Sequence, residues 1–232
     1  MGRFLDRAAV RWTIGVGLPV AMILLDPAVF HSRIFGVGMP ILGRVKPFCY
    51  VATAIAVSVA VLFLSRRRPS AFVSGIFGGS AVFATVLGCA ILPFSALGIL
   101  ILGLGLLGFT PFLMAAVYSR LAKAAFPPAT AGGRPLAAFT LGVTVILGVS
   151  AGIQIAASGA MQESLADISA ADVALAGRGV ERLRRWSMIL DLEPLIAAYV
   201  DETDPDRRAR IASAYHELTG QDAAQRAGEL AD

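Results

Sequence analysis

The first two-thirds of this chain contain almost no acidic side chains. Only Asp6 and Asp26 precede Glu163, although the 232 residues include 16 Asp or Glu in all. Between Ser70 and Tyr118 there is no Asp, Glu, Lys, Arg or His. An uncharged run longer than about 18 residues favours a membrane span over a buried helix of a soluble protein. The missing charge therefore argues against a water-soluble fold for this part of the chain.

Reactive and metal-binding side chains are also scarce. The two cysteines and the two histidines form neither a disulfide framework nor a zinc pattern. No fingerprint of a hydrolase, metalloprotease or nucleotide-binding loop occurs. One formal G-x-G-x-x-G, at residues 103–108, lies inside an apolar run and follows no predicted strand. We therefore expect no cofactor and no metal, and we favour a protein that is not an enzyme.

Long apolar runs are what the sequence has instead. They predict an all-α, polytopic membrane protein with about five transmembrane helices, because lipid satisfies no backbone hydrogen bonds. The transmembrane domain is expected over residues 1–158, and a small, polar, acidic helical tail over 159–232. The first run is short and follows a basic N-terminus, so a cleaved signal or a re-entrant segment stays open beside an uncleaved span. The expected spans are 11–30, 47–65, 70–92, 96–118 and 136–158.

The two central spans are predicted to form a hairpin that turns at Leu92-Pro93-Phe94-Ser95. Pro111 lies within the second arm and is expected to kink it. Small residues recur four apart on the first arm, and on the fifth span at Thr144, Gly148, Gly152 and Ala156. Such stripes let helices approach closely. The second stripe predicts either self-association or packing against the Gly75–Gly88 face of the same chain.

The distribution of charge predicts the orientation. Residues 1–158 carry twelve Lys or Arg against two Asp or Glu, whereas residues 159–232 carry eight Arg against fourteen Asp or Glu. Nine of the twelve cations fall in segments that share one side if the N-terminus is cytoplasmic. By the positive-inside rule the N-terminus is then cytoplasmic and the tail extracytoplasmic. The basic excess is a topology signal and does not predict nucleic-acid binding. His31 to Lys46 is interpreted as an interfacial loop.

The tail reads as helical. A helix with a break at Gly177-Arg178-Gly179 is followed by a short element at Leu192–Tyr199. A clearer helix starts at Asp204, which suits an N-cap, with Pro205 at the first helical position, and it closes at Gly220. Gln221 to Asp232 is expected to fray. The Arg182–Trp186 run is interpreted as a solvated helix face with one buried Trp, with contact to the membrane surface as the alternative.

Five residues are candidates for function. Asp26 is an acid within or beside a span, where it is either a proton or cation site or the mark of a span end. Pro111 and Gln154 are candidates for a hinge or a path through the membrane. Cys49 and Cys89 are structural cysteines or, alternatively, a thiol pair facing an oxidising exterior.

These features favour a non-enzymatic protein of a bacterial inner membrane that anchors or assembles other components. Its expected partners are the lipid bilayer and a protein, or a second copy bound through the small-residue faces and the tail. A small transporter or channel subunit is the alternative, and a membrane thiol-redox protein is a further one.

Overall fold

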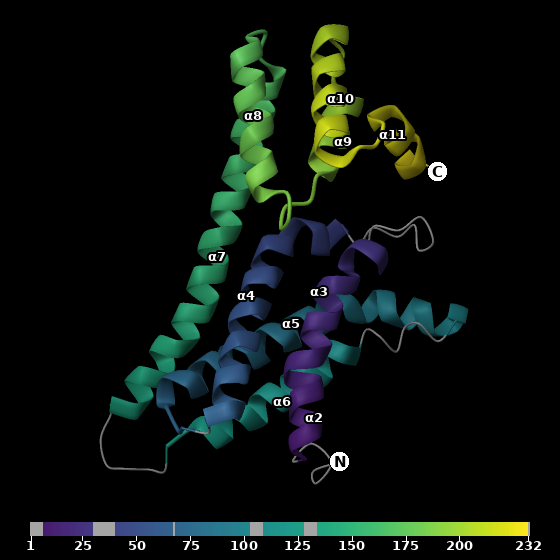
Figure 1. The fold of residues 1–232 in the computed structure, drawn as a ribbon. Helices are drawn as coiled ribbons and strands as arrows, with labels where there is room; N and C mark the ends of the chain where they lie inside the picture. Colours follow the sequence, from purple (N-terminus) through teal and green to yellow (C-terminus); the bar gives the residue numbers. More distant parts are fainter. Residues whose placement is uncertain (1–6, 30–39, 67, 103–108, 128–133, 232) are drawn as a thin grey trace. The chain divides into compact units, whose positions relative to one another are not determined.

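The computed structural model describes residues 7–29, 40–66, 68–102, 109–127 and 134–231, and this part of the chain is helical and contains no strand. The all-α prediction is therefore confirmed. The helices divide into two compact units (Figure 1). Unit 1 comprises Met1–Gly38 and Cys49–Ser150, and unit 2 comprises Met39–Phe48 and Ala151–Asp232. Helices α4 and α7 each run across the boundary.

Three helices in the described part are long and apolar enough to cross a membrane. The apolar segments are Val45–Arg66 of α4 (Pro40–Arg66), Ala71–Leu92 of α5 (Ala71–Leu102), and α7 (Arg134–Ser169). The expected count of about five is not confirmed. The first expected span is a shorter apolar helix, and the fourth is not a single helix.

The expected turn at residues 92–95 is wrong, because α5 continues through it to Leu102. The next described helix is α6, Thr110–Ala125. Residues 96–118 are thus divided between two helices. The pair α5 and α6 is nevertheless antiparallel. The Ser70 amide donates to the Ala125 carbonyl at 2.7 Å, and Ser74 Oγ donates to the Ala122 carbonyl at 2.7 Å. These bonds satisfy carbonyls at the open C-terminal end of α6.

The N-terminal segment forms α2 (Ala8–Trp12), a π-helical turn η1 (Thr13–Gly17) and α3 (Leu18–Val29). The turn packs on α6, where Tyr118 Oη donates to the Gly15 carbonyl at 3.0 Å. Tyr118 is buried and stacks on Phe77 of α5, with the ring centroids 6.2 Å apart. A polar bond and a ring contact therefore fix three segments of unit 1 to one another.

Helices α5 and α7 cross at glycines. A Cβ on Gly75 would overlap the Phe139 carbonyl and lie 3.1 Å from Gly142 Cα, and a Cβ on Gly142 would overlap the Phe72 carbonyl. One alternative placed the Gly75–Gly88 face against the Thr144–Ala156 stripe, but Gly75 instead meets Phe139 and Gly142, which precede that stripe. A Cβ added to Gly148 or to Gly152 would meet no described atom of another helix within 4 Å. The predicted packing of these two glycines against the Gly75–Gly88 face is therefore wrong.

Helix α4 begins at Pro40, so the predicted interfacial loop of residues 31–46 is helical over its last part, and residues 31–39 lie outside the described residues. The early start is compatible with Pro40, because proline is tolerated in the first turn of a helix. Pro47 lies inside α4 and is fully buried.

In unit 2, the end of α7 packs with α8 (Val173–Trp186), α9 (Glu193–Asp201), α10 (Pro205–Thr219) and α11 (Ala223–Ala231). Their shared core is apolar and contains fully buried side chains of α7, α8, α9 and α10: Ile168, Leu183, Leu195, Ile196 and Ile211. The tail therefore does not form a core alone. It uses the last turns of the long apolar helix as one wall.

The prediction for α10 is confirmed residue by residue. Asp204 Oδ1 accepts from the amides of Asp206 at 2.9 Å and Arg207 at 3.3 Å, Pro205 starts the helix, and Gly220 ends it with φ 71°. The short element at Leu192–Tyr199 corresponds to α9. Two other predictions are wrong. Helix α8 is unbroken at residues 177–179, and residues 223–231 form α11, capped by Asp222 Oδ1 on the Ala224 amide at 2.8 Å.

Candidate functional site

Gln154 joins two helices of unit 2. Its Oε1 accepts from the Phe48 amide of α4 at 3.1 Å, and its Nε2 donates to Ser158 Oγ on α7 at 3.3 Å. A proline within a helix removes one hydrogen bond and opens the backbone beside it. The amide that follows Pro47 is therefore accessible to a side-chain acceptor. Gln154, predicted as a candidate for a membrane path, has a structural partner at this proline.

The structure describes the side chain of Pro111 but not that of Asp26. Asp26 lies in α3, which continues past Pro27 to Val29, and its side chain lies outside the described residues. Pro111 is buried in the first turn of α6. It was expected to kink a span, and it instead starts a helix, where its missing amide hydrogen has no helical acceptor to serve. The hinge interpretation of Pro111 as a mid-span kink is wrong.

Cys49 lies on α4 and Cys89 on α5, and neither is part of a disulfide. Cys49 is half-buried, whereas Cys89 is exposed. The interpretation of buried structural cysteines therefore does not describe Cys89. No group of three or more His, Cys, Asp or Glu side chains in the described part of the chain is placed to hold a metal ion.

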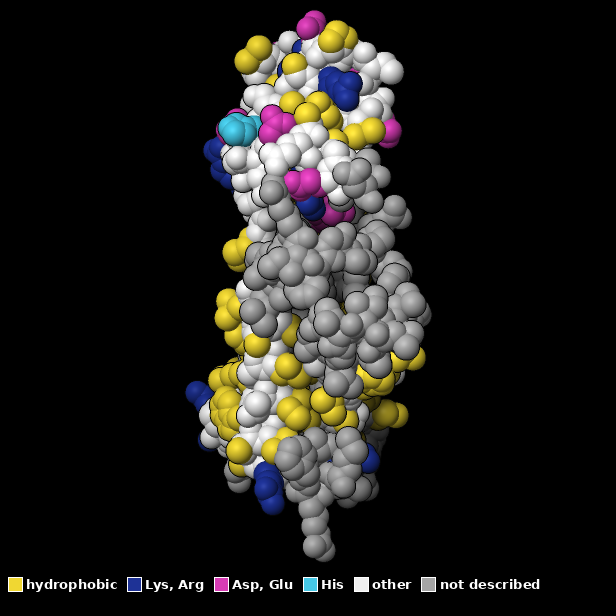
Figure 2. All heavy atoms as spheres, turned by 90° about the vertical axis from the view of Figure 1, so that its right-hand side faces the viewer, with side chains coloured by type: hydrophobic (Ala, Val, Ile, Leu, Met, Phe, Trp, Pro, Cys, Tyr) yellow, Lys and Arg dark blue, Asp and Glu magenta, His cyan; other side chains and the backbone are white. Residues whose placement is uncertain are grey.

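Cationic side chains of unit 1 gather at one of its ends, here called the basic end. The end of α6 meets the start of α5 through the Ser70–Ala125 bond, and the first part of α7 lies against the start of α5, where Gly142 meets Phe72. The N-terminal segment joins this group through Tyr118. In the lower half of Figure 2, exposed hydrophobic side chains are followed, toward the lower end, by Lys and Arg side chains. The described cations of the basic end are Arg7, Arg11, Arg66, Arg68, Arg120, Lys123 and Arg134.

Apolar side chains are exposed along the three long helices. Leu62 is 55% exposed, Val86 is 62% exposed and Ile155 is 73% exposed. Most of the apolar stretch of α4, and most of that of α7, is not buried inside the structure. Extensive exposure of apolar side chains along long helices is typical of contact with a membrane or with other proteins.

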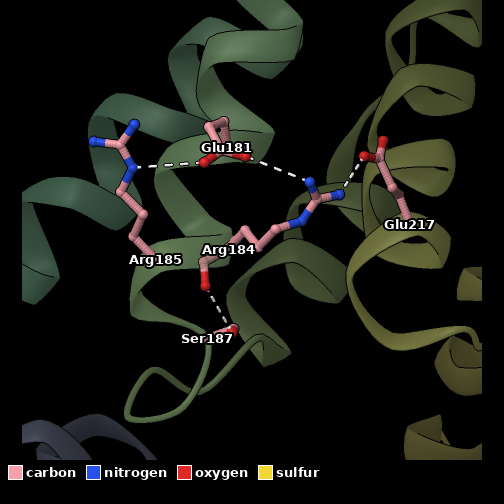
Figure 3. Close-up of polar contacts among 5 residues, drawn as sticks. All are labelled: Glu181, Arg184, Arg185, Ser187 and Glu217. Atoms are coloured by element: carbon pink, nitrogen blue, oxygen red, sulfur yellow. Dashed lines mark hydrogen bonds and ion pairs between the residues drawn. The ribbon is translucent and has the colours of Figure 1, made fainter.

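Arginines connect the helices of the tail to one another. Figure 3 shows Arg184 of α8 between Glu181 and Glu217, at 3.4 Å and 2.6 Å, so that it reaches from α8 to α10. Arg185 pairs with the other oxygen of Glu181 at 3.6 Å. These groups are about half exposed or more, and ion pairs of that kind contribute little stability. Their main effect is to fix the position of α8 relative to α10.

Further arginines act at other helix contacts. Arg182 of α8 lies 3.0 Å from Asp167 of α7, and Arg210 of α10 donates to the Ser169 carbonyl at 3.1 Å. The second contact places a cation at the C-terminal end of α7, where the helix dipole favours it. Arg208 lies 4.6 Å above the ring of Tyr199, which joins α10 to α9. The tail cations are thus used largely inside the tail, whose sequence keeps an excess of acid.

Burial raises the pKa of Tyr215 in α10 above the ordinary value of a tyrosine, while the nearby Arg226 lowers it to a smaller extent. Tyr215 Oη donates to Gln221 Oε1 at 3.4 Å, and the ring is part of the tail core. A neutral phenol therefore belongs to the folded tail.

Sequence reasoning missed the helix contacts at Gly142 and Gly15. Neither glycine stands in a regular stripe with its partner, and both partners are distant in the sequence. The comparisons with known proteins add no family to this picture: no family model matches the chain, and neither a curated protein nor a solved structure is similar to it.

Proposed function

We propose that the chain is a multi-pass protein of a bacterial inner membrane that holds a helical, acidic tail at the membrane surface as an attachment point for another protein. The observation that carries this proposal is the continuity of α7. One helix of 36 residues contains the apolar segment and also supplies a wall of the tail core. At 1.5 Å per residue it is about 54 Å long, well beyond the ~30 Å of a bilayer core.

The exposed apolar surfaces of α4 and α7 support insertion into lipid. In water, side chains such as Leu62 and Ile155 would each lose the free energy of burial, about 1.5–3 kcal/mol for a large aliphatic group. In a bilayer the acyl chains cover them. The number of spans beyond the three candidate helices remains part of the proposal, since α2 to α3 and α6 are shorter.

The basic end supports a cytoplasmic position for the N-terminus. Its cations belong to the ends of α4, α6, α7 and the N-terminal segment, which are linked to one another through the α5–α6 pair. This arrangement supports a position on one side of the membrane for all of them. The positive-inside rule makes that side cytoplasmic. Helix α7 starts at this end and crosses once, so the tail is extracytoplasmic. This argument holds whether or not the first apolar helix crosses, because it depends on contacts rather than on a count of spans.

A role without catalysis is supported by how the polar groups of the described tail are used. The arginines bind neighbouring helices, and the caps Asp172, Asp204 and Asp222 bind backbone amides. The tail offers other proteins an acidic surface with a few exposed apolar side chains, among them Val173 and Val200 at 83% and 54%. A partner with a basic surface fits this chemistry.

The test is photo-crosslinking in intact cells. A photoreactive residue at Val200, on the surface of α9, is expected to give a discrete protein adduct that survives extraction in mild detergent. The matched control places the same residue at Val82, which is 57% exposed on α5 within an apolar span. An adduct to protein at both positions, or at neither, contradicts the proposed role of the tail.

A further inference from the structure

The turn between α8 and α9 returns along α7 toward the apolar part of that helix. Gly179 lies against α7, since a Cβ there would be 2.8 Å from the Ser164 carbonyl and 3.1 Å from Asp167 Cβ. Arg182 reaches Asp167 at 3.0 Å and Glu163 at 3.7 Å. The two helices are antiparallel, so each residue further along α8 lies opposite an earlier residue of α7. By this register the end of α8 lies opposite about residues 158–160.

The apolar part of α7 ends close to this level. A bilayer core needs about 20 helical residues, and twenty residues from Leu136 end at Ile155. Ile155 is 73% exposed and the first charged residue after it is Glu163. The boundary between acyl chains and headgroups is therefore expected just beyond Ile155.

Helix α4 independently indicates where the boundary between acyl chains and headgroups lies. Its Phe48 amide is bonded to Gln154, one residue before Ile155. Lys46 precedes Phe48 by two residues, and no charged residue follows it along α4 until Arg66. Two helices of unit 2 thus change from polar to apolar at one height, and the contact between them fixes that height.

The side chains of the turn suit this position. Trp186 is half-buried, and its carbonyl accepts from the amides of Ile189 at 3.0 Å and Leu190 at 2.9 Å, which closes the turn. Met188 is 80% exposed and the side chain of Arg185 is 75% exposed. Tryptophan is enriched at the membrane interface, and arginine can keep its charge in the headgroups while its stem lies on apolar surface.

We propose that residues 185–189, here called the interfacial turn, lie in the phospholipid headgroup layer, with Trp186 and Met188 reaching the edge of the acyl chains. The inference rests on the proposed membrane insertion. It adds a second attachment of the tail to the bilayer besides α7, and the occupant is lipid because the turn adjoins the apolar surface of α7 at the level where two helices leave the bilayer core.

Exposure alone does not distinguish this turn, and Val173 provides the matched control. It is 83% exposed at the other end of α8. Fifteen residues separate it from Met188, and thirteen of them, from Val173 to Trp186, span about 20 Å along α8 at 1.5 Å each. A probe at Val173 is therefore expected in water, while a probe at Met188 is expected in lipid.

The experiment uses the full chain with Cys49→Ser and Cys89→Ser, reconstituted in vesicles of phosphatidylcholine and phosphatidylglycerol. Flotation of the vesicles tests insertion first. A nitroxide is then attached at Met188→Cys or at Val173→Cys, and its collisions with oxygen and with a water-soluble nickel complex are compared. The ratio of oxygen to nickel accessibility is expected to be several-fold higher at position 188 than at 173.

The outcomes separate the inference from its premise. A chain that does not float with the vesicles overturns both. A floating chain with equal ratios at the two positions overturns the interfacial turn alone. Low accessibility to both reagents at position 188 indicates a protein contact and also overturns it. As a readout without cysteine substitution, Trp186 in the Trp12→Phe chain is expected to be quenched by lipids brominated near the headgroup, and loss of that quenching contradicts the proposal.

Discussion

Gly75 and Gly142 face each other across the α5–α7 crossing, and each backbone occupies the space that a side chain on the other would need. We expect Gly75→Ala to lower the stability of the full chain by about 1–3 kcal/mol or more, because the contact is with backbone that cannot rotate away. Gly148→Ala is the matched control on α7, since no described atom lies within 4 Å of its added methyl group. Thermal unfolding followed by circular dichroism in mild detergent measures both. Similar losses for the two variants contradict the crossing.

The bond between Tyr118 and Gly15 is expected to hold the N-terminal segment on α6. Tyr118→Phe leaves the Gly15 carbonyl without this donor in a buried position, which costs about 1–3 kcal/mol. The segment then opens more often, so trypsin cleaves faster at Arg7 or Arg11. Ser150→Ala is the control, because its buried hydroxyl bonds only to the Ile146 carbonyl of its own helix. Unchanged cleavage in Tyr118→Phe refutes the role of this bond.

Gln154 is expected to act through its oxygen. Gln154→Met keeps a similar length and removes the acceptor for the Phe48 amide, and we expect a loss of about 1 kcal/mol in stability. Gln154→Glu keeps an acceptor oxygen at this position and is the comparison. Amide hydrogen exchange at Phe48 is the direct measurement, with faster exchange expected in Gln154→Met. Equal exchange in the Met variant and the unmodified chain is incompatible with the contact.

The tail is expected to lose stability in strong alkali through Tyr215. Burial raises the pKa of this phenol in the folded chain above the value of about 10 that it has when unfolded. Its contribution is therefore complete below pH 10 and decreases as the pH rises through the folded-state pKa. Thermal unfolding of the tail between pH 8 and pH 11 is expected to show a decline that is shallower in Tyr215→Phe. Parallel curves for the two chains argue against a buried phenol.

Local caps are expected to matter more to the tail than its surface ion pairs. Asp204→Ala removes the oxygen that binds two amides at the start of α10, a change worth about 0.5–2 kcal/mol. Glu217→Gln weakens the 2.6 Å pair with Arg184, but both groups are about half exposed, so at most about 1 kcal/mol is expected. Chemical denaturation of the full chain compares them. A larger loss for Glu217→Gln reverses the prediction.

The part of the fold that could be predicted from the sequence is the part set by neighbours along the chain. Asp204, Pro205 and Gly220 specify α10 because each acts on backbone within a few residues of itself. The long apolar runs specify helices, since an apolar environment leaves the backbone no other partner.

Errors arose where a distant contact decides the structure. Gly179 resembles a helix breaker in sequence, but it lies within α8 because only a glycine fits against the Ser164 carbonyl. Residues 221–232 were predicted to fray, yet Ala223 is buried and Arg226 reaches Glu193 on α9 at 3.8 Å. Pro93 suggested a turn, but α5 is helical on both sides of it.

For the candidate residues too, local features could be predicted from the sequence, whereas distant contacts could not. Gln154 could be named from its polarity within an apolar run, while its partner is a backbone amide next to Pro47, more than one hundred residues earlier. No pattern in the sequence predicts such a pair. Pro111 was named for a kink because the start of α6 is not visible in an apolar run that continues through it.

The glycine crossing also restricts how α7 can move. Sliding this helix along its axis by one turn would bring Phe139 or Ile146 to the place of Gly142, where the Phe72 carbonyl leaves no room. The crossing therefore fixes the position of α7 along its axis relative to α5. The close backbone contact opposes displacement of α7 along its axis relative to α5.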